Sequence, residues 1–262
     1  MKYGFIGAGN MGSAIVKSLI KSTNDIVLSD RSGKAKVLAE ELNIKYDTNE
    51  FIANNCEYIF LGVKPYMLKD VVKPLKGILN KRKPVVVSML AGVNIKDIEE
   101  HLDTPIIRIM PNTPTAIGKG VIPYCINDQV TEEKLNIWLQ DMKYCGLLDS
   151  LEEKLIDAAS ALSGSGPAYV YELIEAMADG AVLCGMPRAK AYKYASYTLL
   201  GSASMQLETD LHPGVLKDQV TSPGGSTIEG LRVLEENSFR GTVINCIKAA
   251  YDKNKKLKYL LV

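Results

Sequence analysis

The chain has 262 residues, with 31 basic and 30 acidic side chains and a formal net charge of +1. This length suits one large domain or two modest ones, and the balanced charge argues against a surface built for nucleic acid or anionic lipid. Five scattered cysteines without CxxC spacing indicate reduced, buried thiols of a cytoplasmic protein. Two histidines are too few for a zinc site, so no metal is predicted. No apolar run reaches the roughly 18 residues of a transmembrane helix.

The first half of the chain alternates short apolar runs, rich in β-branched residues, with amphipathic segments. The apolar runs predict strands at Lys2–Ile6, Ile26–Ser29, Tyr58–Gly62, Val85–Ser88, Ile106–Met110 and Val121–Ile126. Strands that are apolar throughout are typical of a parallel sheet covered on both faces. The amphipathic segments predict helices, one of them capped at Thr131. This alternation predicts a Rossmann domain over residues 1–150, an α/β fold with a doubly wound parallel sheet.

From about Leu151 onward the pattern indicates helices alone. One helix is expected over Pro167–Cys184, where Gly185 and Pro187 terminate it, and Cys184 is expected in its buried core. Residues 151–262 therefore form an all-helical second domain.

The next expected helix, Arg188–Leu207, carries a stripe of mostly small residues. The stripe consists of Ala191, Ala195, Leu199 and Ser202. It is either core within one chain or a surface that packs closely against another subunit. We favour the second interpretation, which makes residues 151–262 a dimerisation domain.

A GxGxxG motif spans Gly7–Gly12, directly after the first predicted strand and at the start of a predicted helix. This context favours a dinucleotide site over a structural turn. Gly7 would permit the tight turn, Gly9 would let the backbone approach the pyrophosphate, and Gly12 would allow close helix–strand packing. The motif therefore predicts a nicotinamide dinucleotide cofactor.

The end of the second strand carries two conflicting signals on which dinucleotide binds. Asp30 is at the position of an acidic residue that bonds the ribose 2′-hydroxyl of NAD. Arg31 follows at once and can hold the 2′-phosphate of NADP. A mobile Arg31, with Asp30 turned away, would still accept NADP.

Two further stretches, rich in glycine and serine, can supply backbone donors. The segment Ser226–Glu229 resembles a capping box, so a helix should begin near Ser226 with the N–H groups of Gly225, Ser226 and Thr227 available for a carboxylate. A well-capped structural helix explains the same pattern. The stretch Leu162–Tyr169, LSGSGPAY, indicates a turn that is either a second donor loop or an interdomain hinge.

Taken together, these segments resemble the pyrroline-5-carboxylate reductases along essentially the whole chain. The resemblance rests on FIGAGNMG at Phe5–Gly12, VKP at Val63–Pro65, PNTP at Pro111–Pro114, LSGSGPAY at Leu162–Tyr169 and HPGVLKDQVTSPGGSTI at His212–Ile228. The first motif occurs in many Rossmann enzymes, whereas the last two are highly specific. The family implies NAD(P)H, usually NADPH, as the reductant of the cyclic imine 1-pyrroline-5-carboxylate to L-proline. It also implies a helical domain interleaved with a partner subunit, and often a ring of dimers.

The resemblance also implies which residues form the site. Its cofactor contacts correspond to Ile6, Gly7, Ala8, Gly9, Asn10, Met11, Gly12, Asp30, Arg31, Asn49, Val63, Lys64 and Ala91. Its substrate-binding residues correspond to Gly225, Ser226, Thr227 and Gln219, together with the acidic residue Glu153. Thr227 is the implied catalytic residue, as a proton donor or hydrogen-bonding hydroxyl. From the proline that follows it, His212 is expected to be a turn or packing residue and not a base.

Two other functions share parts of this pattern. A β-hydroxyacid dehydrogenase would carry a catalytic lysine on the helix after the interdomain glycine loop, and Pro167–Cys184 contains no lysine. A non-catalytic NAD(P)H sensor would be expected to lose the hydroxyl of Thr227 or the turn before it, and both are present.

Overall fold

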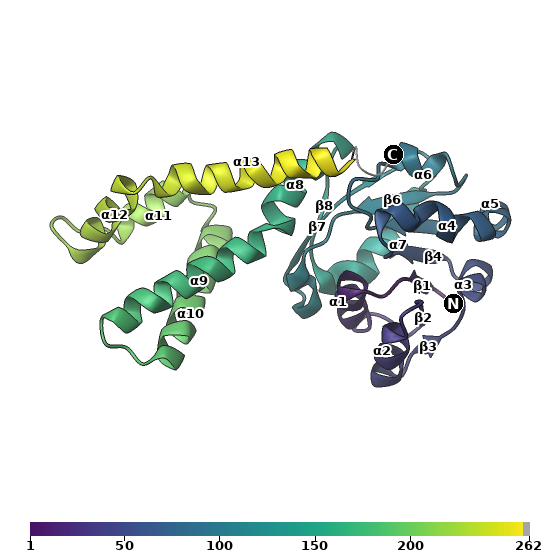
Figure 1. The fold of residues 1–262 in the computed structure, drawn as a ribbon, viewed down its shortest axis with the longest axis horizontal. Helices are drawn as coiled ribbons and strands as arrows, with labels where there is room; N and C mark the ends of the chain where they lie inside the picture. The colour runs from purple at the N-terminus through teal and green to yellow at the C-terminus, as the bar shows by residue number, and fades with distance from the viewer. Residues whose placement is uncertain (259–262) are drawn as a thin grey trace. The chain divides into compact units, whose positions relative to one another are not determined.

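The computed structural model describes residues 1–258, which form two compact units (Figure 1). Unit 1 contains residues 1–165 and the chain from Ala250 onward, and unit 2 contains Gly166–Ala249. The predicted boundary after residue 150 precedes this division. The reason is packing: Ile156 is fully buried in a core cluster beside the sheet of unit 1.

Unit 1 is built on one eight-stranded sheet in the order β3-β2-β1-β4-β5-β6-β7-β8. The strands are β1 (Tyr3–Ile6), β2 (Ile26–Ser29), β3 (Lys45–Tyr46), β4 (Tyr58–Leu61), β5 (Val85–Ser88), β6 (Ile106–Ile109), β7 (Gly120–Ile126) and β8 (Gly146–Ser150). The six predicted strands are confirmed. Strand β3 was not predicted because it has only two residues, and β8 because it starts with glycine and ends in polar residues.

The sheet differs from the prediction at one edge, where β7 runs antiparallel to β6. The other strand pairs are parallel. Parallel neighbours need a crossover of about a dozen residues or more. The connection between β6 and β7, residues 110–119, contains only a short 3₁₀ turn, so the chain returns in the opposite direction.

Both faces of the sheet are covered, as a doubly wound fold requires. On β1, Phe5 belongs to one core cluster and Ile6 to the other, and on β4 Phe60 and Leu61 divide in the same way. Helices α1 (Asn10–Leu19), α2 (Lys34–Leu42) and α7 (Glu132–Met142) pack into the first cluster. Helices α3 (Asn49–Asn55), α4 (Leu68–Val72), α5 (Lys76–Arg82) and α6 (Ile95–Glu99) pack into the second. The predicted cap of α7 is confirmed, because the Thr131 side chain accepts from the Lys134 N–H.

The glycine- and serine-rich segment near residue 163 is helical, so the predicted turn is wrong. Helix α8 (Ile156–Ala159) continues into the π-helical segment Ser160–Gly164, and α9 (Gly166–Leu183) follows. The Ser165 N–H donates to the carbonyl of Ser160 at 3.1 Å, the wide bond of a π-turn. The backbone donors of this segment are used inside the helix, which removes the predicted second donor loop.

Unit 2 consists of helices, as predicted for the second half of the chain. After α9 come α10 (Arg188–Thr209), α11 (Pro213–Gln219), α12 (Ser226–Glu236) and α13 (Phe239–Lys258), and α13 ends in unit 1. Helices α9 and α10 pack against each other. The hydrophobic residues buried in unit 2 are Ala178, Ala191 and Ala195. The predicted stripe is therefore buried at Ala191 and Ala195 within the chain itself, whereas Ser202 is exposed.

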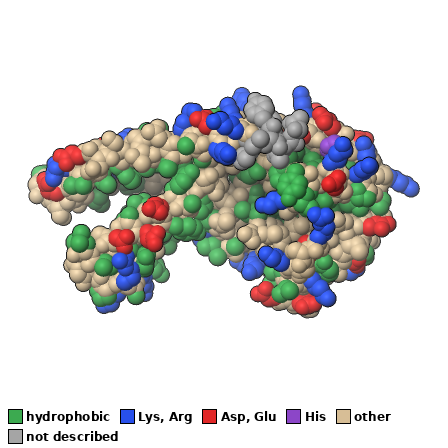
Figure 2. Space-filling model, viewed as in Figure 1, with side chains coloured by type: hydrophobic (Ala, Val, Ile, Leu, Met, Phe, Trp, Pro, Cys, Tyr) green, Lys and Arg blue, Asp and Glu red, His purple; other side chains and the backbone are tan. Residues whose placement is uncertain are grey.

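None of the larger hydrophobic side chains of unit 2 is buried in the single chain, and many of them are exposed (Figure 2). Among the most exposed are Leu183, Tyr197, Leu207, Val220 and Ile244. A helical unit that buries only alanines has little core of its own, and extended exposed apolar surface marks an interaction site.

Two of the five cysteines contradict the expectation of buried thiols. Cys184 and Cys246 are exposed in the single chain, whereas Cys56, Cys125 and Cys145 are buried. Cys184 is not in a helix core because α9 ends at Leu183 and Gly185 then turns the chain at φ +93°. Burial raises the pKa of the Cys125 thiol to about 11. None of the helices within residues 1–258 combines the length and hydropathy that a membrane crossing requires.

Candidate functional site

The glycine loop after β1 has the geometry that dinucleotide binding needs. Gly7 has φ +90°, and a Cβ there would lie 2.9 Å from the carbonyl of Gly62. A Cβ at Gly12 would lie 3.0 Å from the Gly7 carbonyl oxygen, so this glycine permits close packing of α1 on the loop. Gly9 has open space around its Cβ position and caps α1 without a side chain. The first N–H groups of α1 therefore face a cradle that fits a pyrophosphate.

The other predicted cofactor residues lie after the carboxyl ends of neighbouring parallel strands. Asp30 and Arg31 follow β2, Val63 and Lys64 follow β4, and Ala91 follows β5. Asn49 begins α3, and its Oδ1 accepts from the Ser29 hydroxyl at 2.7 Å. The order of β2, β1 and β4 makes this edge the switch point where doubly wound sheets bind ligands. The side chains of Ile6 and Ala8 are buried in the core, so only their backbone can contact a cofactor.

Asp30 does not present a free carboxylate. Its oxygens accept from the Ser32 hydroxyl at 2.5 Å and from the N–H groups of Gly33 at 3.1 Å and Ala35 at 3.2 Å. Partial burial alone would raise the pKa of Asp30, but these hydrogen bonds outweigh it and hold the pKa below its ordinary value. Asp30 thus organises its own loop, and Arg31 beside it is exposed.

In unit 2, a tight turn precedes the predicted substrate loop. The Gly225 N–H donates to the Ser222 carbonyl at 3.1 Å, with Pro223 second and Gly224, at φ +66°, third. Proline followed by a residue with positive φ is the pattern of a type II turn. A Cβ on Gly225 would collide with the Ser222 hydroxyl in its present rotamer, so a larger residue there would have to displace that side chain.

Helix α12 begins at Ser226 as predicted, but the capping box is wrong. Gly225 is the N-cap and supplies no side chain, while Glu229 pairs with Arg232. The N–H of Gly225 is used in the turn, which leaves those of Ser226 and Thr227 for a ligand. An uncapped N-terminus favours a carboxylate more than a capped one would, because its N–H groups and helix dipole are uncompensated.

Thr227 and the neighbouring predicted residues are accessible. Ser226 and Thr227 are exposed in the first turn of α12, and Gln219, at the end of α11, is exposed too. His212 caps α11, where its Nδ1 accepts from the Gly214 N–H at 3.0 Å. This confirms the turn role expected for His212.

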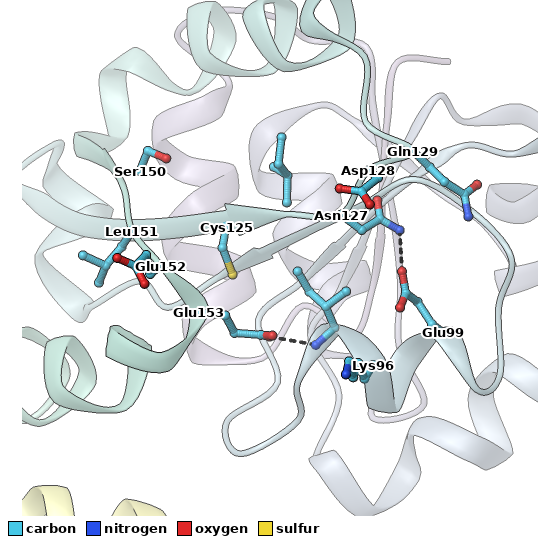
Figure 3. Close-up of a pocket in the computed structure, with 12 residues that line it drawn as sticks. Lys96, Glu99, Cys125, Asn127, Asp128, Gln129, Ser150, Leu151, Glu152 and Glu153 are labelled. Atoms are coloured by element: carbon cyan, nitrogen blue, oxygen red, sulfur yellow. Dashed lines mark hydrogen bonds between the residues drawn. The ribbon is translucent and has the colours of Figure 1, made fainter.

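Glu153, expected among the substrate-binding residues, is engaged elsewhere. Its Oε1 accepts from Arg108 Nη1 at 2.9 Å. It also accepts from the Ile95 N–H at 2.8 Å, the bond drawn as a dashed line from Glu153 in Figure 3. Arg108 comes from β6, and its side chain is only 1% exposed. We therefore assign Glu153 to holding α6 against β6, a role that its position in the sequence does not reveal.

Glu153 also lines a surface cavity of about 780 Å³, shown in Figure 3. The cavity includes Asn127, whose N–H donates to the carbonyl of Ile106 at the start of β6. It thus extends to the amino end of the parallel strands, away from the edge that carries the glycine loop. Apart from Glu153 it contains none of the predicted site residues, so we do not assign the substrate to it.

We expect Glu153→Gln to lower the free energy of unfolding by about 2–3 kcal/mol, because it leaves the buried Arg108 without its counter-ion. The estimate is below that for a fully buried pair because the Glu153 side chain is 31% exposed. Urea denaturation measures the change, with Glu152→Gln as control. Glu152 forms an exposed ion pair with Lys154, so its loss should cost less than about 1 kcal/mol. Equal effects of the two substitutions would contradict the assigned role.

Three residues that were not predicted hold the loop after β6 and the loop that carries Asp30. The Asn112 side chain joins the loop after β6 to the π-helical segment: it donates to the Ser163 carbonyl and accepts from the Val121 N–H, both at 2.9 Å. Ser32 and Tyr46 both bond to Asp30. The PNTP motif could have pointed to Asn112. Nothing in the sequence pointed to the bonds that Ser32 and Tyr46 form with Asp30.

Comparison with known proteins covers both parts of the chain. The family described as NADP oxidoreductase coenzyme F420-dependent matches residues 2–92, and pyrroline-5-carboxylate reductase dimerisation matches residues 153–257. Pyrroline-5-carboxylate reductase of Escherichia coli (strain K12) is 42% identical and covers 98% of both chains. The one from Glycine max is 41% identical over 97% of this chain and 95% of its own.

Solved structures agree with this match. The Plasmodium falciparum pyrroline carboxylate reductase with NADP bound has a TM-score of 0.87 at 32% identity, and 98% of each chain is covered. The pyrroline-5-carboxylate reductase from Coxiella burnetii has a TM-score of 0.88 at 33% identity, with the same coverage. The dimerisation match begins close to the predicted boundary and includes the helices with exposed hydrophobic side chains, which supports a homo-oligomer. With this identity over nearly its whole length, the chain belongs to the pyrroline-5-carboxylate reductase family.

Proposed function

We propose that this protein reduces 1-pyrroline-5-carboxylate to L-proline with NAD(P)H, the last step of proline biosynthesis. Unit 1 supplies the dinucleotide cradle and unit 2 the substrate loop. The observation that carries the proposal is the Pro-Gly-Gly turn that presents Thr227 on an uncapped helix N-terminus. The names of relatives at about 40% identity support the same reaction.

The residues of the loop fit the chemistry of a cyclic imine acid. The N–H groups of Ser226 and Thr227 would hold the substrate carboxylate, with Gln219 nearby. The Thr227 hydroxyl would donate a hydrogen bond to the ring nitrogen or relay a proton to it. A hydroxyl is a weak acid, so water or prior protonation of the imine would supply the proton. When bound, the reduced nicotinamide supplies the hydride.

We propose NADPH as the favoured cofactor and NADH as a possible substitute. The carboxylate of Asp30 is occupied by its own loop, and the exposed cation of Arg31 lies beside it. The relative from Plasmodium falciparum was solved with NADP bound, which supports this choice.

Arg31→Ala is expected to raise KM for NADPH about tenfold and to change KM for NADH little. The substitution removes a charge-assisted hydrogen bond to the 2′-phosphate, and only NADPH has this phosphate. Steady-state kinetics with both cofactors measure the difference. The control is Lys81→Ala, which removes an exposed cation from α5. A preference for NADPH that survives Arg31→Ala would exclude Arg31 as the residue that recognises the phosphate.

We further propose that the homodimer associates into a ring of dimers in the cytoplasm. The wide distribution of exposed hydrophobic residues over the helices of unit 2 supports subunit contacts beyond those of a single dimer. The cytoplasmic location is supported by the cysteines: all five are free thiols, which is typical of a reducing compartment. Light scattering tests the assembly: a mass equal to two chains would contradict the ring.

The deciding experiment is turnover by the purified protein. With pyrroline-5-carboxylate and NADPH or NADH, we expect oxidation of the cofactor and stoichiometric formation of proline. No turnover with either cofactor would refute the proposed reaction. A β-hydroxyacid dehydrogenase would instead use a lysine on the helix after the glycine-rich segment, and α9 contains none.

A further inference from the structure

The loop between β2 and α2 holds the Asp30 carboxylate with donors from two sides. The Ser32 hydroxyl and the N–H groups of Gly33 and Ala35 bond to its oxygens from within the loop. From β3, the Tyr46 hydroxyl donates to the Asp30 carbonyl at 3.0 Å and lies 3.5 Å from its Oδ1. The carboxylate is therefore directed toward the start of α2, where its charge compensates the first N–H groups of that helix.

This orientation matters because an acidic residue at this position usually accepts a hydrogen bond from the ribose 2′-hydroxyl of NAD. Here each carboxylate oxygen already accepts from a backbone donor, and Oδ2 also accepts from Ser32. A carboxylate turned toward the ribose would also repel a 2′-phosphate, because both groups carry negative charge. Holding Asp30 away removes both the attraction for NAD and the repulsion of NADP.

We propose that Ser32 and Tyr46 are positioning residues that set cofactor selectivity by keeping Asp30 away from the ribose. This inference rests on the proposed use of a nicotinamide dinucleotide, and it adds how one acidic residue is made compatible with NADPH. Ser32 acts directly on the carboxylate. Tyr46 acts from the neighbouring strand and ties the loop to the sheet edge.

The test measures the dissociation constants of NADH and NADPH by the fluorescence of the bound nicotinamide, without pyrroline-5-carboxylate. Ser32→Ala and Tyr46→Phe are each prepared alone and together with Asp30→Asn. We expect each single substitution to tighten NADH and to lower the ratio Kd(NADH)/Kd(NADPH) about fivefold, the effect of one hydrogen bond. Tyr144→Phe, an exposed tyrosine near β8, is the matched control and should leave the ratio unchanged.

The Asp30→Asn background separates positioning from direct contact. If the released carboxylate bonds the ribose, the gain in NADH affinity disappears when Asp30 is replaced by asparagine. An unchanged ratio, or tighter NADH binding that persists in the Asp30→Asn background, would overturn the proposal. So would a weaker NADPH complex with no gain for NADH, because it would mean that Ser32 contacts the phosphate itself. Binding is measured apart from turnover, so a protein that binds both cofactors but forms no proline would refute the proposed reaction and leave this test intact.

Discussion

Thr227→Ala is expected to lower kcat about 100-fold, while the dissociation constant for NADPH stays near that of the wild type. The expectation follows from the position of Thr227 in the first turn of α12, exposed and beside N–H groups that lack a side-chain cap. Loss of a group that donates to the reacting nitrogen typically costs 10²- to 10⁴-fold. We take the lower end because a hydroxyl orients or relays the proton and is not its source.

Thr227→Ser is the matched control for this substitution. Serine retains the hydroxyl and removes only a methyl group, so kcat should stay within a few-fold of the wild type. Steady-state kinetics give kcat, and fluorescence titration gives the cofactor affinity. If Thr227→Ala leaves kcat unchanged, the hydroxyl has no part in the reaction. If Thr227→Ala weakens NADPH binding by as large a factor as it lowers kcat, the substitution acts through the structure of the protein.

Gly7→Ala is expected to weaken NADPH binding about 100-fold. Its backbone has φ +90°, which costs an L-residue about 1–3 kcal/mol, and the added Cβ would lie 2.9 Å from the backbone of Gly62. The two strand-end loops would have to separate, and the first N–H groups of α1 would lose their alignment on the pyrophosphate. Equilibrium titration with NADPH measures the loss, and thermal unfolding shows how much of the strain destabilises the fold.

Gly77→Ala provides the control for a glycine without such a constraint. Gly77 lies in α5, has no positive φ, and has open space around its Cβ position. Alanine favours helix at such a position, so the melting temperature should stay level or rise while NADPH affinity is unchanged. Similar losses of affinity in both variants would show that the geometry of Gly7 is not what the cofactor requires.

Much of unit 1 was predictable because its signals are local. Strands β1, β2, β4, β5 and β6 are buried on both faces, which leaves a continuous hydrophobic pattern in the sequence. The roles of Gly7 and Gly12 also follow from spacing, because a strand, a tight turn and a helix in immediate succession bring these glycines together. The start of α12 at Ser226 was predictable from the proline and glycines before it.

The predictions were wrong where a side chain or a backbone group has more than one possible partner. The sequence of Ser226–Glu229 matches a capping box. In the structure, however, Glu229 pairs with Arg232 one turn along, and Gly225 is the N-cap. The glycines and serines of Leu162–Tyr169 indicated a turn, but the first residues of this stretch belong to the π-helical segment Ser160–Gly164. The ion pair between Glu153 and Arg108 was not predictable from the sequence, because the two residues are 45 positions apart. The role of Glu153 at the substrate stays a prediction.

Short motifs and periodic hydrophobicity were enough to predict the class of cofactor, the Rossmann and helical halves, and the family. The anchoring of the loop that carries Asp30 depends on the tertiary structure, because the Tyr46 hydroxyl reaches the Asp30 carbonyl through strand pairing between β2 and β3. The same holds for the buried Arg108–Glu153 pair and for the lack of a large core in unit 2. Burial and ion pairing depend on contacts between residues that are far apart in the sequence, and a local sequence pattern does not reveal those contacts.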